Sequence, residues 1–310
     1  MIEIENLTKK FDDFTAVEEI SLNVAKGQVL ALLGPNGAGK TTTVRMLTSI
    51  IRPTSGRAMV AGYDVVNQGR QVRASVGVLT EQHGLYNRMN AGEYLDFYRQ
   101  LYGIDRETAN QRIDELLERF NLADVKKKRL GEFSKGMRQK LALVRALIHK
   151  PSVLLLDEPT SAMDPESAHV VRDSIAGLRD QEVTIILCTH NLAEAEELAD
   201  HVAILRRGRI IFNGSIQGLK ENLVGPAEFE AVFSGGLAEW AGDYLPEGVS
   251  LIDRGENYVR FSIDHPESNN PKLIKQMIDQ RLNLVSFRQI NHSLEMAYLE
   301  TVGKFAEGPQ

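Results

Sequence analysis

The stretch 34–41, with the sequence GPNGAGKT, limits what this chain can fold into more than any other feature. It matches the phosphate-binding loop pattern G-x-x-x-x-G-K-S/T. An apolar run at 28–33 predicts a buried strand before the loop, and residues 42–50 predict a helix after it. Glycines let successive N–H groups point into one cavity, and the helix N-terminus adds positive charge there. The chain is therefore expected to contain an α/β domain that binds a nucleoside triphosphate.

Two side chains of this loop have roles that follow from their chemistry. Lys40 is expected to reach the β- and γ-phosphates of the nucleotide, and the Thr41 hydroxyl is expected to bind Mg²⁺. The other loop residues expected to contact ATP are Asn36, Gly37, Ala38, Gly39 and Thr42. Kinases, GTPases and transport motors share this loop, so by itself it indicates only that a nucleotide is bound.

The bulk properties are typical of a cytosolic protein. The length of 310 residues suffices for one large domain and one small one. The one cysteine, Cys188, excludes an intrachain disulfide and lies in an apolar run. No apolar window approaches the length of a membrane span, and the N-terminus lacks the pattern of a signal peptide. The chain is expected to be cytoplasmic, with any membrane role exerted through a partner.

The net charge argues against nucleic acid as a partner. Residues 226–310 carry 13 acidic and 7 basic side chains, a net charge of −6 that equals the net charge of the whole chain. An acidic segment of this kind repels phosphate backbones and anionic lipid. We therefore expect no nucleic-acid binding.

Strand and helix patterns alternate up to about residue 215. The short apolar runs 153–156 and 183–187 are typical of strands buried on both faces. Asn90 and Glu93 have the spacing of a capping box, and Asp164 followed by Pro165 predicts another helix start. We place an α/β nucleotide-binding domain at 1–222, with a mainly helical subdomain at about 83–150.

A different pattern follows the break at Gly225–Pro226. It predicts strands at 228–233, 249–253, 258–263 and 284–289 and helices at 236–244, 271–282 and 293–302. The resulting order β-α-β-β-α-β is that of a ferredoxin-like α+β unit. Residues 226–310 are therefore expected to form a small accessory domain.

Four further motifs carry chemistry. Asp157 ends an apolar strand, where its carboxylate can bind Mg²⁺, and Glu158 beside it can polarise an attacking water as a general base. The stretch 134–139 (SKGMRQ) opens a helix whose N-terminus suits an anion. The stretch 161–164 (SAMD) follows the carboxylates, and His190 ends the next strand.

Together these motifs resemble the ATP-binding subunits of ABC transporters, from Met1 to about Phe212. The family's signature L-S-G-G-Q is represented by residues 133–137 (FSKGM), which keep Ser134 and Gly136. The resemblance implies a mixed-sheet core with a helical subdomain, and ATP and Mg²⁺ as ligands. Further roles follow position by position. Phe11 would stack on adenine with Val17 nearby, His190 would contact the γ-phosphate, and Asp164 would couple two ATPase subunits. The family's glutamine-loop position, a Mg²⁺ ligand, falls at Glu81, or at Gln82 if the register shifts by one.

The resemblance also implies two kinds of protein partner. ATP would be held between this chain and a second ATP-binding subunit, identical or different, and a separate membrane permease would dock on residues 81–101. The loop 82–87 is the better candidate for that contact, because Tyr94, Tyr98 and Leu101 have the spacing of a core stripe. Three segments, at 81–86, 134–140 and 293–299, look like those of export-type systems for drugs, sodium or polysaccharide-like cargo.

Three other classes fit the motifs less well. ABC proteins of translation usually carry two cassettes, whereas this chain has one phosphate-binding loop. DNA-repair ATPases of the same superfamily insert a coiled coil between the loop and the signature, and residues 41–134 contain no heptad pattern. A simple P-loop kinase would leave Ser134 and His190 without a role. The transporter hypothesis accounts for all the motifs, although the cargo cannot be derived from them.

Overall fold

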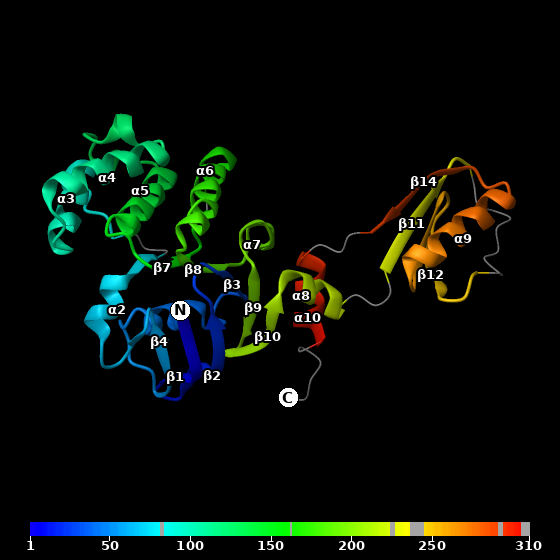
Figure 1. Cartoon of the computed structure of the whole chain (residues 1–310), viewed down its shortest axis with the longest axis horizontal. Helices are drawn as coiled ribbons and strands as arrows, with labels where there is room; N and C mark the ends of the chain where they lie inside the picture. Colours follow the sequence, from blue (N-terminus) through cyan, green and yellow to red (C-terminus); the bar gives the residue numbers. More distant parts are fainter. Residues whose placement is uncertain (81–83, 162, 224–226, 236–244, 291–293, 305–310) are drawn as a thin grey trace. The chain divides into compact units, whose positions relative to one another are not determined.

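The computed structural model describes residues 1–80, 84–161, 163–223, 227–235, 245–290 and 294–304 (Figure 1). The chain divides into two compact units, Met1–Ile216 and Gln217–Gln310. This division lies slightly before the predicted break at Gly225–Pro226. Within the described residues, no helix combines the length and the apolar character that crossing a membrane requires.

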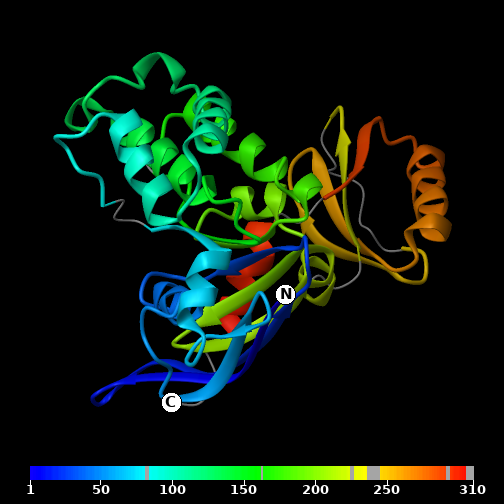
Figure 2. The ribbon, with the colours of Figure 1, turned by 60° about the vertical axis from the view of Figure 1, so that its left-hand side comes forward.

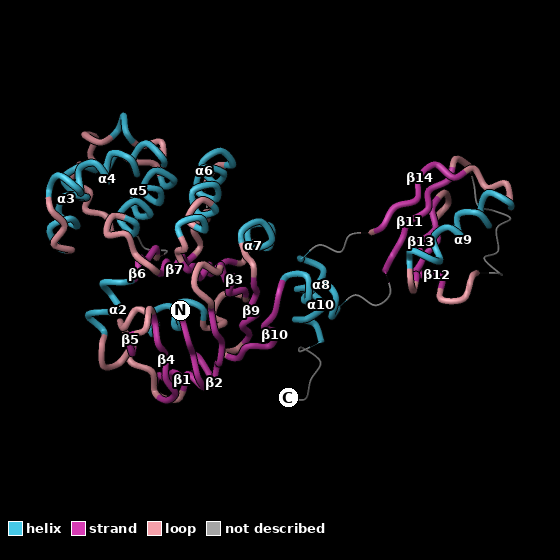
Figure 3. Tube along the Cα trace, in the orientation of Figure 1, coloured by secondary structure: helices cyan, strands magenta, loops and turns pink. Residues whose placement is uncertain are grey.

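The first unit is built on a six-stranded sheet with the order β10-β9-β3-β8-β7-β6 (Figure 3). Its strands are β3 (Val29–Leu33), β6 (Val76–Leu79), β7 (Val153–Asp157), β8 (Thr184–Thr189), β9 (His201–Arg206) and β10 (Arg209–Ser215). All neighbours are parallel except β9 and β10, which form an antiparallel hairpin. The carboxyl ends of β3, β7 and β8 therefore meet at one edge, where the phosphate-binding loop, the Asp157–Glu158 pair and His190 follow them.

Both faces of this sheet are covered, as the continuous apolar runs predict. Along β7, Leu154 and Leu156 belong to one hydrophobic cluster, while Val153 and Leu155 belong to another on the opposite face. All five residues of β7 are buried. Alternate side chains of one strand thus anchor it to two cores, which holds the end of the strand, and so Asp157, rigidly in place.

A second, antiparallel sheet of the first unit has the order β2-β1-β4-β5. Its strands are β1 (Ile2–Phe11), β2 (Phe14–Val24), β4 (Ser55–Val60) and β5 (Tyr63–Asp64). β1 and β2 form a hairpin in which Phe11 lies opposite Phe14 across the turn at Asp12 and Asp13. This hairpin brings its aromatic end near the phosphate-binding loop, since the carbonyl of Ala16 lies beside Gly39.

The helices of the first unit fall into two groups (Figure 2). Around the sheets lie α1 (Lys40–Leu47), α2 (Gly69–Ser75), α6 (Pro165–Ala176) and α7 (Leu192–Leu198), with the short turn η3 (Arg179–Gln181). A separate helical group consists of α3 (Ala91–Leu101), α4 (Arg106–Arg119), η1 (Ala123–Val125), η2 (Leu130–Glu132) and α5 (Lys135–Leu147). The predicted capping box opens α3: Asn90 Oδ1 accepts from the Glu93 N–H, and Glu93 Oε2 accepts from the Asn90 N–H, each at 2.9 Å.

The predicted core stripe on α3 is only partly correct. Tyr94 is fully buried and Tyr98 is half-buried, but Leu101 is 67% exposed. Leu101 is the last residue of α3, and the chain reverses directly afterwards at Gly103, whose φ is +66°. Because the helix ends there, Ile104 reaches the hydrophobic cluster in place of Leu101.

The second unit contains a four-stranded antiparallel sheet with the order β12-β13-β11-β14. Its elements are α8 (Ile216–Leu223), β11 (Ala227–Phe233), β12 (Val249–Arg254), β13 (Tyr258–Ile263), α9 (Pro266–Asp279), β14 (Leu284–Gln289) and α10 (Leu294–Lys304). This order of strands is the one expected of a ferredoxin-like unit. The predicted helix at 236–244 lies outside the described residues.

The start of α9 was predicted incorrectly. The helix begins at Pro266 and contains Pro271, the residue at which the sequence pattern predicts its start. Proline is favoured at the first position of a helix, where a missing N–H is tolerated. Pro266 occupies that position, and Pro271 lies inside the helix. Leu273 and Met277 of α9 pack on the sheet in the core of this unit.

Candidate functional site

A cavity of about 410 Å³ opens at the carboxyl edge of the central sheet in the first unit. It is lined by Phe14, Ala16, Pro35, Asn36, Gly37, Ala38, Gly39, Lys40, Thr41, Thr42, Asp157, Glu158, Ser161 and His190. Every loop residue expected to contact the nucleotide is among them, together with both carboxylates and the strand-end histidine. The fold thus gathers four segments that are far apart in the chain around one space.

The loop can take its shape only with glycine at two positions. A Cβ at Gly34 would lie 2.3 Å from the carbonyl oxygen of Leu205, and a Cβ at Gly39 would lie 2.6 Å from that of Ala16. Gly39 also has a φ of +112°, which other residues rarely adopt. Lys40 is only 6% exposed, and its Nζ donates to the carbonyl oxygens of Gly34 at 2.6 Å and Pro35 at 3.3 Å. The ammonium group is therefore held inside the curve of the loop.

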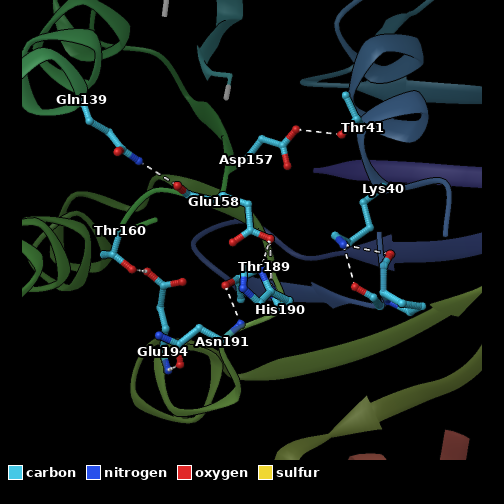
Figure 4. A network of polar contacts seen from close by, with 12 residues as sticks. Lys40, Thr41, Gln139, Asp157, Glu158, Thr160, Thr189, His190, Asn191 and Glu194 are labelled. Carbon is cyan, nitrogen blue, oxygen red and sulfur yellow. Dashed lines mark hydrogen bonds and ion pairs between the residues drawn. The ribbon is translucent and has the colours of Figure 1, made fainter. Parts of the chain in front are cut away.

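Thr41 and Asp157 form a pair of oxygen ligands suited to Mg²⁺. The Thr41 hydroxyl donates to Asp157 Oδ2 at 2.9 Å, and Asp157 is 5% exposed (Figure 4). Hydroxyl and carboxylate oxygens are hard ligands, and Mg²⁺ at such sites takes its remaining ligands from phosphate and water. The described residues hold no group of three or more His, Cys, Asp or Glu side chains that could bind a metal unaided.

Glu158 is held in an unusual backbone conformation. Its φ is +53°, in the left-handed region, where a residue other than glycine costs on the order of 1–3 kcal/mol. Its N–H donates to the carbonyl oxygen of Cys188 at 2.8 Å. Its Oε1 accepts from the backbone N–H of His190 at 3.1 Å and contacts His190 Nδ1 at 2.7 Å. The surrounding structure thus sustains a strained residue whose carboxylate lines the cavity.

Gln139 is bonded to the backbone of Glu158, and no role for it was predicted from the sequence. It lies on α5 and is 3% exposed. Its Nε2 donates to the carbonyl oxygens of Glu158 at 2.7 Å and Pro159 at 2.6 Å. The sequence does contain one signal, because Gln139 is a polar residue among the mostly apolar buried positions of its helix. Its hydrogen-bond partners, however, lie about twenty residues away in the chain, so the sequence alone does not identify them.

Glu194 is a second carboxyl group close to this region, and it was also missed. It is 2% exposed, and its Oε1 accepts from the Thr160 hydroxyl at 2.7 Å (Figure 4). Burial raises the pKa of Glu194, and the charge of Glu158 adds to that rise, while the hydroxyls of Thr160 and Thr189 and the charge of Arg172 oppose it. Within the part of the chain that the structure describes, its Oε2 has no hydrogen-bond partner.

This raised pKa predicts how the stability of the chain depends on pH. The folded chain holds the proton of Glu194 more tightly than the unfolded chain, so stability is lost as pH rises from the unfolded pKa through the folded one. Glu194→Gln cannot ionise and should escape that loss. We expect the difference in melting temperature between Glu194→Gln and the unsubstituted chain to increase as pH rises through this window. The increase should be about 2–4 °C for each kcal/mol of unfolding free energy that the unsubstituted chain loses. Thermal unfolding between pH 4 and 8 tests this, with the exposed Glu196→Gln as control. A difference that does not change with pH would contradict it.

Ser134, Gly136 and Asp164, which were expected to contact nucleotide, do not line this cavity. Ser134 is exposed and caps α5, where its Oγ accepts from the Met137 N–H at 3.2 Å, and Gly136 lies in the first turn. Asp164 is exposed and caps α6, accepting from the Ser167 N–H at 2.9 Å, a bond that lowers the pKa of Asp164. These residues are therefore available to a molecule outside the chain.

The prediction for the adenine contacts needs correction. Val17 is fully buried in a hydrophobic cluster and cannot contact a nucleotide, whereas the neighbouring Ala16 lines the cavity. Phe11 is 43% exposed but does not line the cavity, and Lys9 Nζ lies 4.9 Å from the centre of its ring. Phe14, across the hairpin, does line it. The alternative positions for the glutamine loop, Glu81 and Gln82, lie outside the described residues.

Comparison with known proteins places the chain in a family. A family model described as "ABC transporter" matches residues 17–161. The ABC transporter ATP-binding protein NatA of Bacillus subtilis (strain 168) is 40% identical over 227 residues, which are 72% of this chain and 92% of NatA. This chain is an ABC transporter ATP-binding protein.

Two other similar proteins extend the comparison. The linearmycin resistance ATP-binding protein LnrL of B. subtilis (strain 168) is 29% identical over 308 residues, which are 98% of this chain and 99% of LnrL. The alignment with LnrL thus includes the second unit. A solved structure described as the ATP-binding subunit of an ABC transporter is 28% identical, with a TM-score of 0.68, and the match covers 72% of this chain and 92% of that one.

Family membership explains the chemistry gathered in the cavity. An ABC ATP-binding protein binds ATP and hydrolyses it, and the cassettes of this family dimerise and work with membrane permeases. The mixed α/β fold with a phosphate-binding loop, predicted from the sequence, is confirmed.

Proposed function

We propose that this chain hydrolyses Mg²⁺-ATP at a site completed by a second ATP-binding subunit. The observation that carries the proposal is the separation of the predicted nucleotide residues. The phosphate-binding loop, both carboxylates and His190 share one cavity, whereas Ser134 and Gly136 lie elsewhere on the surface. A signature helix that does not reach its own cavity is free to face the nucleotide of another subunit. This holds for an identical or a different partner.

The cavity residues support a direct displacement by water. Backbone N–H groups of the loop and the Lys40 ammonium bind the β- and γ-phosphates, and Thr41 with Asp157 would hold Mg²⁺. The metal, when bound, would neutralise charge on the phosphate oxygens. Glu158 accepts a proton from the attacking water, and its contact with His190 Nδ1 holds the carboxylate in position. An aromatic residue of the β1–β2 hairpin, Phe11 or Phe14, stacks on the adenine.

The metal assignment has a direct test. Asp157→Asn keeps an oxygen that can accept from Thr41 but removes the charge that attracts Mg²⁺. We expect hydrolysis to require Mg²⁺ in the unsubstituted chain and the variant to need a several-fold higher Mg²⁺ concentration for half-maximal rate. The phosphate-release rate measured against Mg²⁺ decides this, with the exposed Asp173→Asn as control. An unchanged Mg²⁺ requirement would remove Asp157 from the metal site.

The membrane partner is proposed to dock on the helical subdomain, near the stretch that follows residue 81. Exposed apolar side chains gather there: Tyr86 is 53% exposed, Phe97 is 41% exposed and Leu101 is 67% exposed. The rings of Tyr86 and Phe97 contact each other with centroids 6.2 Å apart. Such a group of exposed apolar residues is typical of a protein interface. Leu101, which was predicted to be buried but is exposed, extends this candidate interface.

We infer that the transported cargo leaves the cell and that the chain works on the cytoplasmic face of the membrane. The motifs of the export type and the similarity to a protein named for linearmycin resistance support export. The second unit, from about residue 226, is proposed as an accessory domain of such systems. Purification of the full chain from solubilised membranes, followed by identification of the bound membrane protein, tests the assignment.

A further inference from the structure

The buried glutamine on the signature helix is bonded to the backbone of the proposed catalytic base. Gln139 uses its amide nitrogen to donate to two successive carbonyl oxygens, those of Glu158 at 2.7 Å and Pro159 at 2.6 Å. A primary amide has two N–H donors, so both can be used here. Figure 4 shows this side chain extending from its helix toward the strand end that carries Glu158.

Glu158 depends on such contacts to keep its conformation. Its φ of +53° is unfavourable for glutamate, so the neighbouring structure must supply the compensating energy. On the amino side the Glu158 N–H donates to the carbonyl oxygen of Cys188, and on the carboxyl side the Glu158 carbonyl accepts from Gln139 Nε2 at 2.7 Å and from the Ser161 N–H at 3.2 Å. A rotation of this backbone would move the carboxylate away from His190. The Gln139 amide therefore contributes to where the base lies.

The same helix carries the residue proposed to contact ATP in the partner subunit. Ser134 caps α5, and Gln139 follows five residues later, about 7.5 Å along a rigid helix. Any movement of the helix N-terminus is therefore transmitted to Gln139. In the proposed dimer, Ser134 would face the nucleotide of one site while Glu158 of the same chain acts at the other.

We propose that Gln139 is a positioning residue that links the two ATP sites of the dimer, because it makes the position of Glu158 depend on the signature helix. The proposal rests on the composite site described above. It assigns no contact between Gln139 and ATP. Occupancy of one site aligns the helix, and Gln139 then holds the base of the other site in its strained, productive conformation.

Two substitutions separate positioning from simple stability. Gln139→Met keeps the length and volume of the side chain but removes both donors. We expect it to bind ATP normally and to lose kcat by about 10- to 100-fold, since the carbonyls of Glu158 and Pro159 lose the amide donors of Gln139 and the position of Glu158 is less constrained. Gln139→Glu repels the carbonyls when ionised but can donate one hydrogen bond when protonated. Its kcat, relative to the unsubstituted chain at each pH, should rise as pH falls, whereas that of Gln139→Met should not.

The link between the sites is tested by a double-mutant cycle. Ser134→Ala removes the side chain that caps α5. If the effect of Ser134→Ala on kcat passes through Gln139, the two substitutions are not independent. The fold-loss of kcat in the double variant Ser134→Ala/Gln139→Met should then be smaller than the product of the two single fold-losses. Leu143→Met, also buried on α5 and without a bond to Glu158, is the control for packing and should leave kcat within about twofold.

The outcomes distinguish the proposal from the function on which it rests. If Glu158→Gln hydrolyses ATP at the normal rate, the role of Glu158 fails, and the proposal fails with it. If Glu158→Gln is inactive but Gln139→Met keeps the normal kcat, only the positioning role is wrong. Independent, multiplicative effects of Ser134→Ala and Gln139→Met would overturn the link between the sites. A pH profile of Gln139→Glu parallel to that of Gln139→Met would overturn the hydrogen-bond mechanism.

Discussion

Glu158→Gln should bind ATP and lose hydrolysis by about 10²- to 10⁴-fold, the usual contribution of a general base. Glutamine has nearly the same shape and can still accept a hydrogen bond from His190 through its amide oxygen, so the site should keep its structure. It cannot, however, take a proton from the attacking water. Single-turnover measurement of phosphate release, together with a nucleotide-binding titration, separates the chemical step from binding.

The control for this substitution is Glu166→Gln, which removes an exposed carboxylate from the first turn of α6. It should hydrolyse ATP at close to the normal rate. If Glu158→Gln also turned over normally, the base would have to be sought elsewhere in the cavity.

Ser134→Arg should abolish ATP-dependent dimerisation while each monomer still binds ATP. Ser134 is exposed at the N-terminus of α5, so a long side chain fits the monomer without disturbing its core. In a composite site the same side chain would fill the space needed by the partner's phosphates, and the capping bond to Met137 would be lost. Light scattering of the Glu158→Gln background with ATP, before and after adding Ser134→Arg, measures the effect.

Gln111→Arg provides a matched control, since it adds the same charge to an exposed position on α4 of the helical subdomain. It should dimerise like the parent. A dimer of unchanged stability in the Ser134→Arg variant would mean that this helix does not meet the nucleotide of a second subunit.

The order of elements was largely predictable because its signals are local. A strand, a glycine-rich loop and a helix follow one another directly at 29–47, and the capping box at Asn90 spans only three residues. In the second unit the ends of β13 and β14 agree with the prediction, since each is a short run that contains β-branched and aromatic residues. The prediction of an element's bounds failed where the same local signal occurred twice, as with the two prolines, Pro266 and Pro271, that could each begin α9.

The errors in the site have a different origin. Phe11 and Phe14 flank the same two-residue turn, and only in the folded chain is it decided that Phe14 lines the cavity. Val17 faces the core because of the register of β2, and the motifs in the sequence do not predict that register. Leu101 had the right helical spacing, but the helix ended at that residue. The positions of Phe14 and Val17 depended on neighbours distant in the sequence, whereas the exposure of Leu101 followed from the local turn at Gly103.

The sequence by itself determined which chemical groups this protein has for ATP. The loop from Gly34 to Thr41, the carboxylates Asp157 and Glu158, and His190 are identifiable because phosphate, metal and water each require particular side chains beside a strand end. Only the tertiary structure decided how Glu158, the proposed base, is held. The bonds from Gln139 and His190 to Glu158 join segments 19 and 32 residues apart. Contacts at that separation are set by packing of the whole domain, which a local pattern does not encode.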